Sequence, residues 1–390
     1  MSATRSNELV LEEIRDAQRL EQLRSHWQRL LSRSASATPF NSWEWLVTWW
    51  ECLAPRGGRL CVLAVWSGST LVAVAPMLRR APQRLELLGG DTVGSDYLDV
   101  VCQRTWEVAV SKALADWLHR QPQTLRCVRL LPAALLATHL ARALERRGWR
   151  LSKRADEACP FIPLAEHDWE SFVSGLGQQH RANLRRKLRR IQRDFHMQLD
   201  IAESEPQRAR MLEELFVLHQ RRWDGRGTSE AFQTPANRRF HHRVSRRMLE
   251  RGWLRLFVLR LDETPAAGLY GLCRGQTFYF FQSGFEPTFA KYSPGLVMMG
   301  LSIKHAIAAG CTEYDMLHGT EPYKFLWAKE TRALHRIECF PPTLWGYLDQ
   351  RRATALQRMR GVARVATASA GPVWRRMNAK TAPYLRRRGD

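Results

Sequence analysis

The 390-residue sequence lacks the features of several common protein classes. No apolar run is long enough to cross a bilayer, and the N-terminal stretch MSATRSNELVLEEIRDAQ has no hydrophobic segment of the signal-peptide type. Eight Cys are scattered without a CxxC pair, so neither a disulfide framework nor a structural zinc site is indicated. Neither GxxxxGK nor GxSxG occurs, which leaves P-loop NTPases and α/β-hydrolases unsupported. We therefore expect a cytoplasmic protein with no transmembrane segment and no metal.

Lysine is scarce and arginine abundant, since only eight of the 60 basic residues are Lys, and the net charge is +22. Residues 351–390 hold eleven Lys or Arg and one acidic residue, and residues 180–195 hold seven and one. Concentrated positive charge favours anionic partners, such as cofactor phosphates, an anionic membrane surface or RNA. An Arg-rich genome would give the same excess on an ordinary solvated surface, so charge alone does not choose among these interpretations.

The chain is long enough for two domains, and its 45% hydrophobic content argues against disorder. Strand-like and helix-like segments mix in both halves, which predicts an α/β (α+β) fold with mixed sheets flanked by helices. In the stretch FNSWEWLVTWWECL, aromatic and aliphatic residues recur at helical spacing, so we expect a stripe facing the core. We predict one domain over residues 1–160, a second over 161–346, and a basic helical tail over 347–390.

Three consecutive strand-like runs, WLRLFVLRL, AAGLYGLCRG and QTFYFFQSGF, precede the helix-like SPGLVMMGLSIKHAIAAG and the strand-like TEYDML. At the helix start, Ser293 can cap, Pro294 needs no N–H partner, Gly295 allows close approach and Lys291 adds charge. Free N–H groups at a helix N-terminus suit a pyrophosphate, although Ser-Pro-Gly alone also fits a capped helix without a ligand.

The stretch DMLHGTEPYKFLWAKE, directly after the last strand, concentrates ionisable groups: Asp315, His318, Glu321, Tyr323 and Lys324. Such a cluster favours a site, but Tyr323 and Lys324 also fit the anchoring of a following helix. In HRANLRRKLRRIQRDF, the aliphatic residues share one stripe and the arginines face either solvent or a ligand.

These blocks resemble the GNAT acyl-CoA transferase superfamily, and within it the CelD-type and Fem-like branch, in which two GNAT-like units share one chain. The resemblance covers residues 40–345 and is most specific in FYFFQSGFEPTFAKYSPGLVMMGLSIKHAIAAGCTEYDMLHGTEPYKFLW, with further similarity in GSDYLDVV and RANLRRKLRRIQRD. The Gly-x-Gly phosphate signature typical of GNAT proteins is missing, so Ser293-Pro294-Gly295 must substitute for it.

The resemblance implies an N-acyltransferase that uses acetyl-CoA or another acyl-CoA to modify an amino group on a small or sugar-linked acceptor, in surface polysaccharide biosynthesis. It implies three groups of site residues: catalytic Asp315, Glu321 and Tyr323; cofactor-binding Gln282, Ser283, Lys291, Ser293 and Gly295; and substrate-binding His318, Lys324, Arg185 and Arg189. In such a reaction a base deprotonates the amine, a donor polarises the thioester carbonyl, and an acid protonates the leaving thiolate.

Two other functions stay open at this point. A Fem-like enzyme would transfer an amino acid from aminoacyl-tRNA, and its basic helix and tail would bind the RNA. A non-catalytic scaffold would sit at the inner face of an anionic membrane, held by residues 351–390. Binding of acetyl-CoA would separate the first function from both alternatives.

Overall fold

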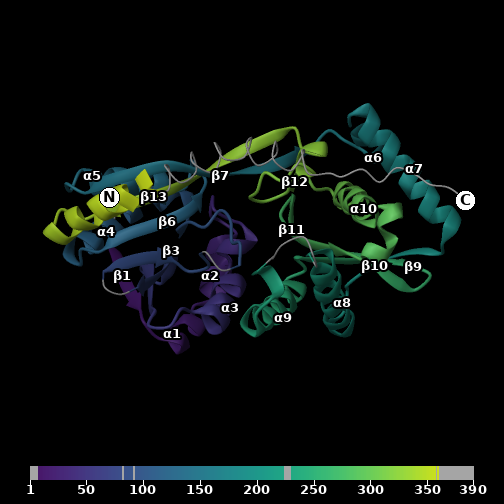
Figure 1. The fold of residues 1–390 in the computed structure, drawn as a ribbon. Helices are drawn as coiled ribbons and strands as arrows, with labels where there is room; N and C mark the ends of the chain where they lie inside the picture. The colour runs from purple at the N-terminus through teal and green to yellow at the C-terminus, as the bar shows by residue number, and fades with distance from the viewer. Residues whose placement is uncertain (1–7, 81–82, 91–92, 224–229, 357, 360–390) are drawn as a thin grey trace, which may run out of the picture.

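The computed structural model describes residues 8–80, 83–90, 93–223, 230–356 and 358–359 (Figure 1). Within these ranges thirteen strands form one mixed sheet, whose main path runs β1-β2-β3-β4-β6-β13-β7-β12-β11-β10-β9-β8. Helices pack along the sheet in both halves of the molecule. The expected mixed α/β fold is therefore confirmed.

The first half of the chain forms β1 (Leu9–Ile14), α1 (Ala17–Gln22), α2 (Arg24–Leu31), α3 (Trp43–Leu53), β2 (Arg59–Ser67), β3 (Thr70–Arg80), β4 (Arg84–Leu87), β5 (Val101–Cys102), α4 (Glu107–Arg120), β6 (Thr124–Leu130), α5 (Ala141–Glu145) and β7 (Arg150–Pro163). The second half forms α6 (Trp169–Ser174), α7 (Gln178–Asp194), β8 (Met197–Ile201), α8 (Glu205–Trp223), α9 (Pro235–Glu250), β9 (Leu254–Leu261), β10 (Thr264–Arg274), β11 (Thr277–Phe285), η5 (Pro287–Tyr292), α10 (Pro294–Ala308), β12 (Glu313–Asp315), η6 (Lys324–Leu326) and β13 (Glu330–Phe340).

The two halves repeat one order of elements. Each has a first strand, helices, three antiparallel strands, a helix and a strand that pairs in parallel: β4 pairs with β6, and β11 pairs with β12. The last strand of each half pairs with strands of the other half. β13 lies between β6 and β7 of the first half, and the end of β7 pairs with β12 of the second. The sheet is thus continuous, and the domain border at residue 160 falls inside β7. The division of the chain into 1–160 and 161–346 stays a proposal.

Most of the expected tail, residues 347–390, lies outside the described residues. A helix covers residues 344–356 and resumes at 358–359; we call it the C-terminal helix. In Figure 1 it is the yellow helix beside the first half of the chain.

The aromatic stripe of α3 lies in the core, as expected. Trp43, Trp45 and Trp49 are buried, and the ring of Trp45 meets Phe240 of α9 at 5.2 Å between centroids. Both α3 and α9 follow the first strand of their half, so equivalent helices join the two halves (Figure 1). Large aromatic side chains contribute the most buried area per residue, which makes this contact a main source of stability.

The helix α8 lies directly on β11 at Gly284. A Cβ at Gly284 would come 2.3 Å from the backbone N of His219. We expect Gly284→Ala to lower the free energy of unfolding by about 1–3 kcal/mol or more, because backbone cannot yield as a side chain does. The exposed Gly175 is a matched control, since its φ is −74° and its nearest contact would be 3.5 Å. Chemical denaturation should show a change of at most about 0.5 kcal/mol for Gly175→Ala; equal effects of both substitutions would contradict the close packing of α8.

Candidate functional site

The strands β11 and β12 separate part-way along the sheet. They pair in parallel from Thr277↔Glu313 to Tyr279↔Asp315, where β12 ends while β11 continues to Phe285. On its other side, β11 pairs with β10 with a register shift at Phe281, which is a β-bulge. A bulge bends a strand and often lies beside an active site. The backbone edge of β11 beyond Tyr279 is therefore not covered by β12.

A cavity of about 420 Å³ lies at this separation. Its walls come from β10, β11, α7, the end of α8, η5, the start of α10 and the turn before β13. They include His180, Asn183, Arg222, Ser283, Gly295 and Tyr323. The matching place in the first half, bordered by β3, β4 and β6, holds a cavity of only about 20 Å³. Because the two halves repeat one order of elements, the difference in volume places the candidate site in the second half.

The N-terminus of α10 reaches the cavity at Ser293 and Gly295. Pro294 has no N–H, and the Gly295 amide has no hydrogen-bond partner in the described part of the chain. Ser293 is left-handed (φ 55°) and its side chain makes no capping hydrogen bond, so the expected cap is absent. A free amide at the positive end of a helix of 15 residues attracts an anion.

His180 lies on α7 and lines the cavity beside Trp327, with ring centroids 4.5 Å apart and the rings perpendicular. Its Nε2 is buried with no hydrogen-bond partner among the described residues. Burial lowers the pKa of His180, so its imidazole is neutral at neutral pH. A neutral imidazole nitrogen without a partner can accept a proton.

Arg222 and Tyr323 form a second polar wall. Arg222 donates through Nη1 to Ser283 Oγ at 2.9 Å and to the Ser283 carbonyl at 3.2 Å. Its guanidinium lies 5.8 Å from the ring centroid of Tyr323. Burial raises the pKa of Tyr323 to about 12, so its hydroxyl keeps the proton and can donate it in a hydrogen bond.

Asp315 lies apart from this cavity. Its side chain is fully buried, and it accepts from Tyr97 Oη at 2.8 Å, from the Leu317 amide at 2.8 Å and from Arg332 Nη1 at 3.3 Å. Burial raises the pKa of Asp315 to about 7, against the opposing influence of Arg332. The carboxylate therefore ties the end of β12 to the first half of the chain.

The turn after Asp315 is held in the same way. The amide and the Nδ1 of His318 both lie 2.8 Å from Asp96 Oδ2. Lys324 is buried, donates through Nζ to the His318 carbonyl at 2.7 Å and lies 3.1 Å from Glu321. These contacts fix residues 315–324 between the halves, and none of the side chains of His318, Glu321 and Lys324 lines the cavity.

The other site residues expected from the sequence fall into two groups, those that line the cavity and those that do not. Ser283, Ser293, Gly295 and Tyr323 line the cavity together. A second group does not reach it: Gln282, Lys291, Arg185 and Arg189. Arg185 lies 3.4 Å from Glu170, while Arg189 and Lys291 are exposed.

Sequence reasoning missed His180, Asn183 and Arg222. His180 precedes the buried Leu184 by four residues, and Asn183 follows His180 by three, so helical spacing places His180 beside the buried face of α7 and Asn183 next to His180. This spacing is visible in the sequence, but the many arginines of the segment led us to interpret it only as a basic helix. Arg222 stands near the end of α8 in a run of polar residues and carries no comparable signal.

Comparisons with known proteins agree with this layout. Residues 178–325 match the Acetyltransferase (GNAT) domain family. The fold is similar to that of FemX (TM-score 0.58, 10% identity, covering 84% of this chain and 96% of that chain). It is also similar to the C-terminal domain of a putative lysylphosphatidylglycerol synthetase from Agrobacterium fabrum (TM-score 0.53, 12% identity, 86% and 97%).

A third similar structure is L-PGS from Bacillus licheniformis (TM-score 0.50, 12% identity, covering 84% of this chain and 92% of that chain). A search of curated proteins found no match. At these identities the structures show the fold alone. The family match over residues 178–325 supports the GNAT part of the sequence resemblance, and the fold is shared with FemX, whereas no comparison supports the CelD-type specifically.

Proposed function

We propose that this chain, whose residues 178–325 match the GNAT acetyltransferase domain family, is an acyl-CoA-dependent N-acyltransferase. Acetyl-CoA is the proposed donor, and the acceptor is an amino group on a small or sugar-linked molecule. One observation carries the proposal: the cavity where β11 and β12 separate is lined by a free helix-terminal amide, a neutral histidine and a protonated tyrosine. The finer proposal of a polysaccharide precursor rests on the sequence resemblance.

The residues around the cavity fit a coenzyme A thioester. The free amide of Gly295, with the dipole of α10, suits a diphosphate. The edge of β11 beyond Tyr279 has backbone groups that can bind an extended arm bearing amides, as an added strand does. The cavity volume of about 420 Å³ lies in the usual range for ligand sites.

Two side chains of the cavity carry out the two proton transfers of the proposed reaction, His180 as the base and Tyr323 as the acid. As the amine nitrogen attacks the thioester carbon, the C–N bond forms, the C–S bond breaks, and the imidazole of His180 takes the proton that leaves the nitrogen. Tyr323 Oη protonates the leaving thiolate, and a backbone N–H of β11 polarises the carbonyl. Asp315, His318, Glu321 and Lys324 hold the turn that carries Tyr323, so we propose a positioning role for them.

Substitution of Gly295 tests the anion site. Gly295→Glu should weaken binding of coenzyme A at least about tenfold, since a carboxylate near the amide repels phosphate, and tenfold is about 1.4 kcal/mol. Gly295→Ala is the matched control, because a Cβ there would meet the Phe285 ring at an ordinary 3.5 Å. Isothermal titration with coenzyme A measures both, and equal affinity of the Glu and Ala variants would contradict the proposed site.

A second candidate is the Fem-like reaction, transfer of an amino acid from aminoacyl-tRNA. The likeness to FemX, which extends over most of both chains, favours it. Arg185 and Arg189 would then contact RNA, and the free amide of Gly295 would face a backbone phosphate. Transfer of labelled acetyl from acetyl-CoA to an amine library, compared with transfer of a labelled amino acid from charged tRNA, separates the two reactions.

No helix in the described ranges is both long and apolar enough to cross a membrane. The prediction that the protein lies at the inner face of a membrane stays a proposal.

A further inference from the structure

The C-terminal helix rests on the first half of the molecule through its small and polar residues. A Cβ at Gly346 would come 2.2 Å from the Pro341 carbonyl oxygen, so the helix begins in close contact with the preceding turn. Asp349 Oδ2 accepts from Thr124 Oγ1 of β6 at 2.8 Å, and the Arg150 guanidinium lies 5.0 Å from the Tyr347 ring centroid. Gly346 is buried and Asp349 and Ala353 are half-buried, and together they mark the inner face.

One face of this helix is apolar apart from Arg352, which falls within the same arc. Leu344, Trp345, Leu348, Leu356 and Met359 are 73%, 63%, 37%, 53% and 61% exposed. At 100° per residue they lie within an arc of about 120°. Six of the eleven exposed large hydrophobic residues in the described part of the chain belong to this helix, so the patch is not ordinary surface scatter. Trp345, Leu348 and Leu356 border open hollows between the helix and the first half, so this face is exposed although it is partly turned toward the body of the protein.

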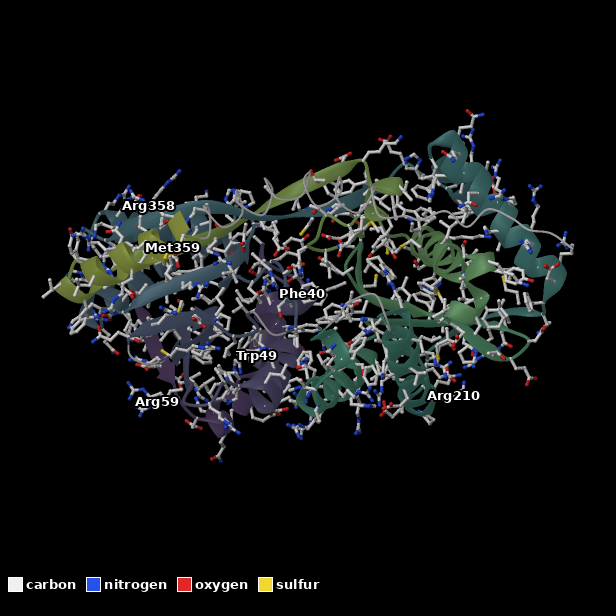
Figure 2. All side chains as sticks on the ribbon, in the orientation of Figure 1. Phe40, Trp49, Arg59, Arg210, Arg358 and Met359 are labelled. Carbon is white, nitrogen blue, oxygen red and sulfur yellow. The ribbon has the colours of Figure 1, made fainter. Side chains whose placement is uncertain are left out.

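Arginines surround the apolar face. A cavity of about 320 Å³ beneath the helix is lined by Arg84, Arg126, Arg154, Arg336 and Arg352, against the carboxylates of Glu338 and Asp349. The adjoining hollow of about 680 Å³ holds Arg59, Arg79, Arg80 and the exposed Trp345. Arg351 and Arg358 are exposed on the helix itself. Figure 2 labels Arg358 and Met359 at the end of the molecule away from α7 and α10.

The positive charge around this face indicates which kind of partner can bind there. A second copy of the chain would bring the same arginines opposite these, and like charges disfavour that contact. An anionic bilayer offers negative headgroups to the guanidinium groups and an apolar layer to Leu344 and Leu348, and Trp345 suits the boundary between the two.

We propose that the apolar face of the C-terminal helix docks the protein peripherally on an anionic phospholipid bilayer. Leu344, Trp345 and Leu348 enter the interface, and the exposed Arg59, Arg351, Arg352 and Arg358 bind lipid phosphates. The remaining arginines near the face already pair with carboxylates of the protein: Arg79, Arg80, Arg84, Arg126, Arg154 and Arg336. In Figure 1 the C-terminal helix lies at the opposite end of the molecule from α7 and α10, which line the cavity of the second half, so docking does not depend on the reaction proposed there.

Co-sedimentation of the full chain with vesicles tests the docking. Vesicles of equal parts phosphatidylcholine and phosphatidylglycerol should bind the protein at least about tenfold more tightly than phosphatidylcholine alone, and salt should weaken the binding. The triple variant Leu344→Ser, Trp345→Ser, Leu348→Ser should lose at least about tenfold in affinity for the anionic vesicles. The matched control is Val10→Ser with Val108→Ser, two isolated residues that are 60% and 69% exposed, and it should bind like the unchanged protein.

Two further measurements make the result decisive. Coenzyme A titration and thermal unfolding should be the same for the triple variant and the unchanged protein, which shows that the variant is folded and that its cavity is intact. The proposal is overturned if the unchanged protein does not bind anionic vesicles, or if the triple variant binds them equally well. It is also overturned if light scattering shows a dimer that the triple substitution dissociates, because the face would then join two copies.

Discussion

Replacing His180 by Gln is expected to lower the turnover of acyl transfer by about 10²–10⁴-fold, the usual contribution of general acid–base catalysis. Gln keeps a polar group of similar size beside Trp327 but cannot take up a proton at working pH. Since the Gly295 amide and the edge of β11 are unchanged, the affinity for coenzyme A should be retained. Steady-state kinetics with acetyl-CoA and titration of coenzyme A measure the two quantities.

The pH dependence identifies the role of His180. Burial lowers the pKa of His180 below its ordinary value, so kcat/KM of the unchanged enzyme should fall only when the pH drops through that lowered value and the imidazole becomes charged. In His180→Gln this fall of kcat/KM at acidic pH should be absent. His119→Gln, on the exposed end of α4 in the other half, is the control and should leave turnover and profile as they were. Wild-type turnover in His180→Gln would rule out its role as base.

Replacing Asp315 by Ala is expected to lower the free energy of unfolding by about 3–5 kcal/mol, the usual cost of removing one partner of a buried ion pair. The substitution leaves the Arg332 guanidinium and the Tyr97 hydroxyl without their shared acceptor. Glu321→Ala is the control from the same turn, because Glu321 is 54% exposed and its ion pair with Lys324 should contribute at most about 1 kcal/mol. Urea unfolding of both variants measures the difference, and a similar small loss in each would contradict the structural role of Asp315.

Asp315 should also shape the pH dependence of stability. Burial raises the pKa of Asp315 to about 7, above the value near 3.9 of an unfolded Asp. Between these values the folded protein binds more protons than the unfolded chain, so this group's stabilising contribution is full below pH 4 and is lost as the pH rises to 7. In Asp315→Asn that slope should disappear. Unfolding free energies at pH 4.5 and 7 for both proteins test this; identical slopes would contradict it.

The sequence predicts the local architecture of the second half well, because its signals lie within short segments. The strand run QTFYFFQSGF, the helix start at Pro294 and the strand ending in Asp315 appear in the structure as β11, α10 and β12. The place of β13 was not predicted, because its partners β6 and β7 lie far back in the chain. Strand pairing over such distances leaves no local pattern in the residues.

The candidate site, too, could be predicted from the sequence only in part. Gly295 was found because helix-start chemistry marks it, whereas Ser283 and Tyr323 came from the family resemblance; all three line one cavity. Asp315 and His318 belong to the same stretch of ionisable groups as Tyr323. Their side chains, however, form hydrogen bonds with Tyr97 and Asp96 of the first half. Only the contact between halves decides which polar residues face a ligand and which hold the structure together.

A crystal structure of the chain with coenzyme A tests the central claim most directly. The account predicts diphosphate oxygens within hydrogen-bond distance of the Gly295 amide, and a thiol end between β11 and β12 beside His180 and Tyr323. Coenzyme A bound in the first half or elsewhere on the surface, with the cavity of the second half empty at saturating concentration, would contradict it.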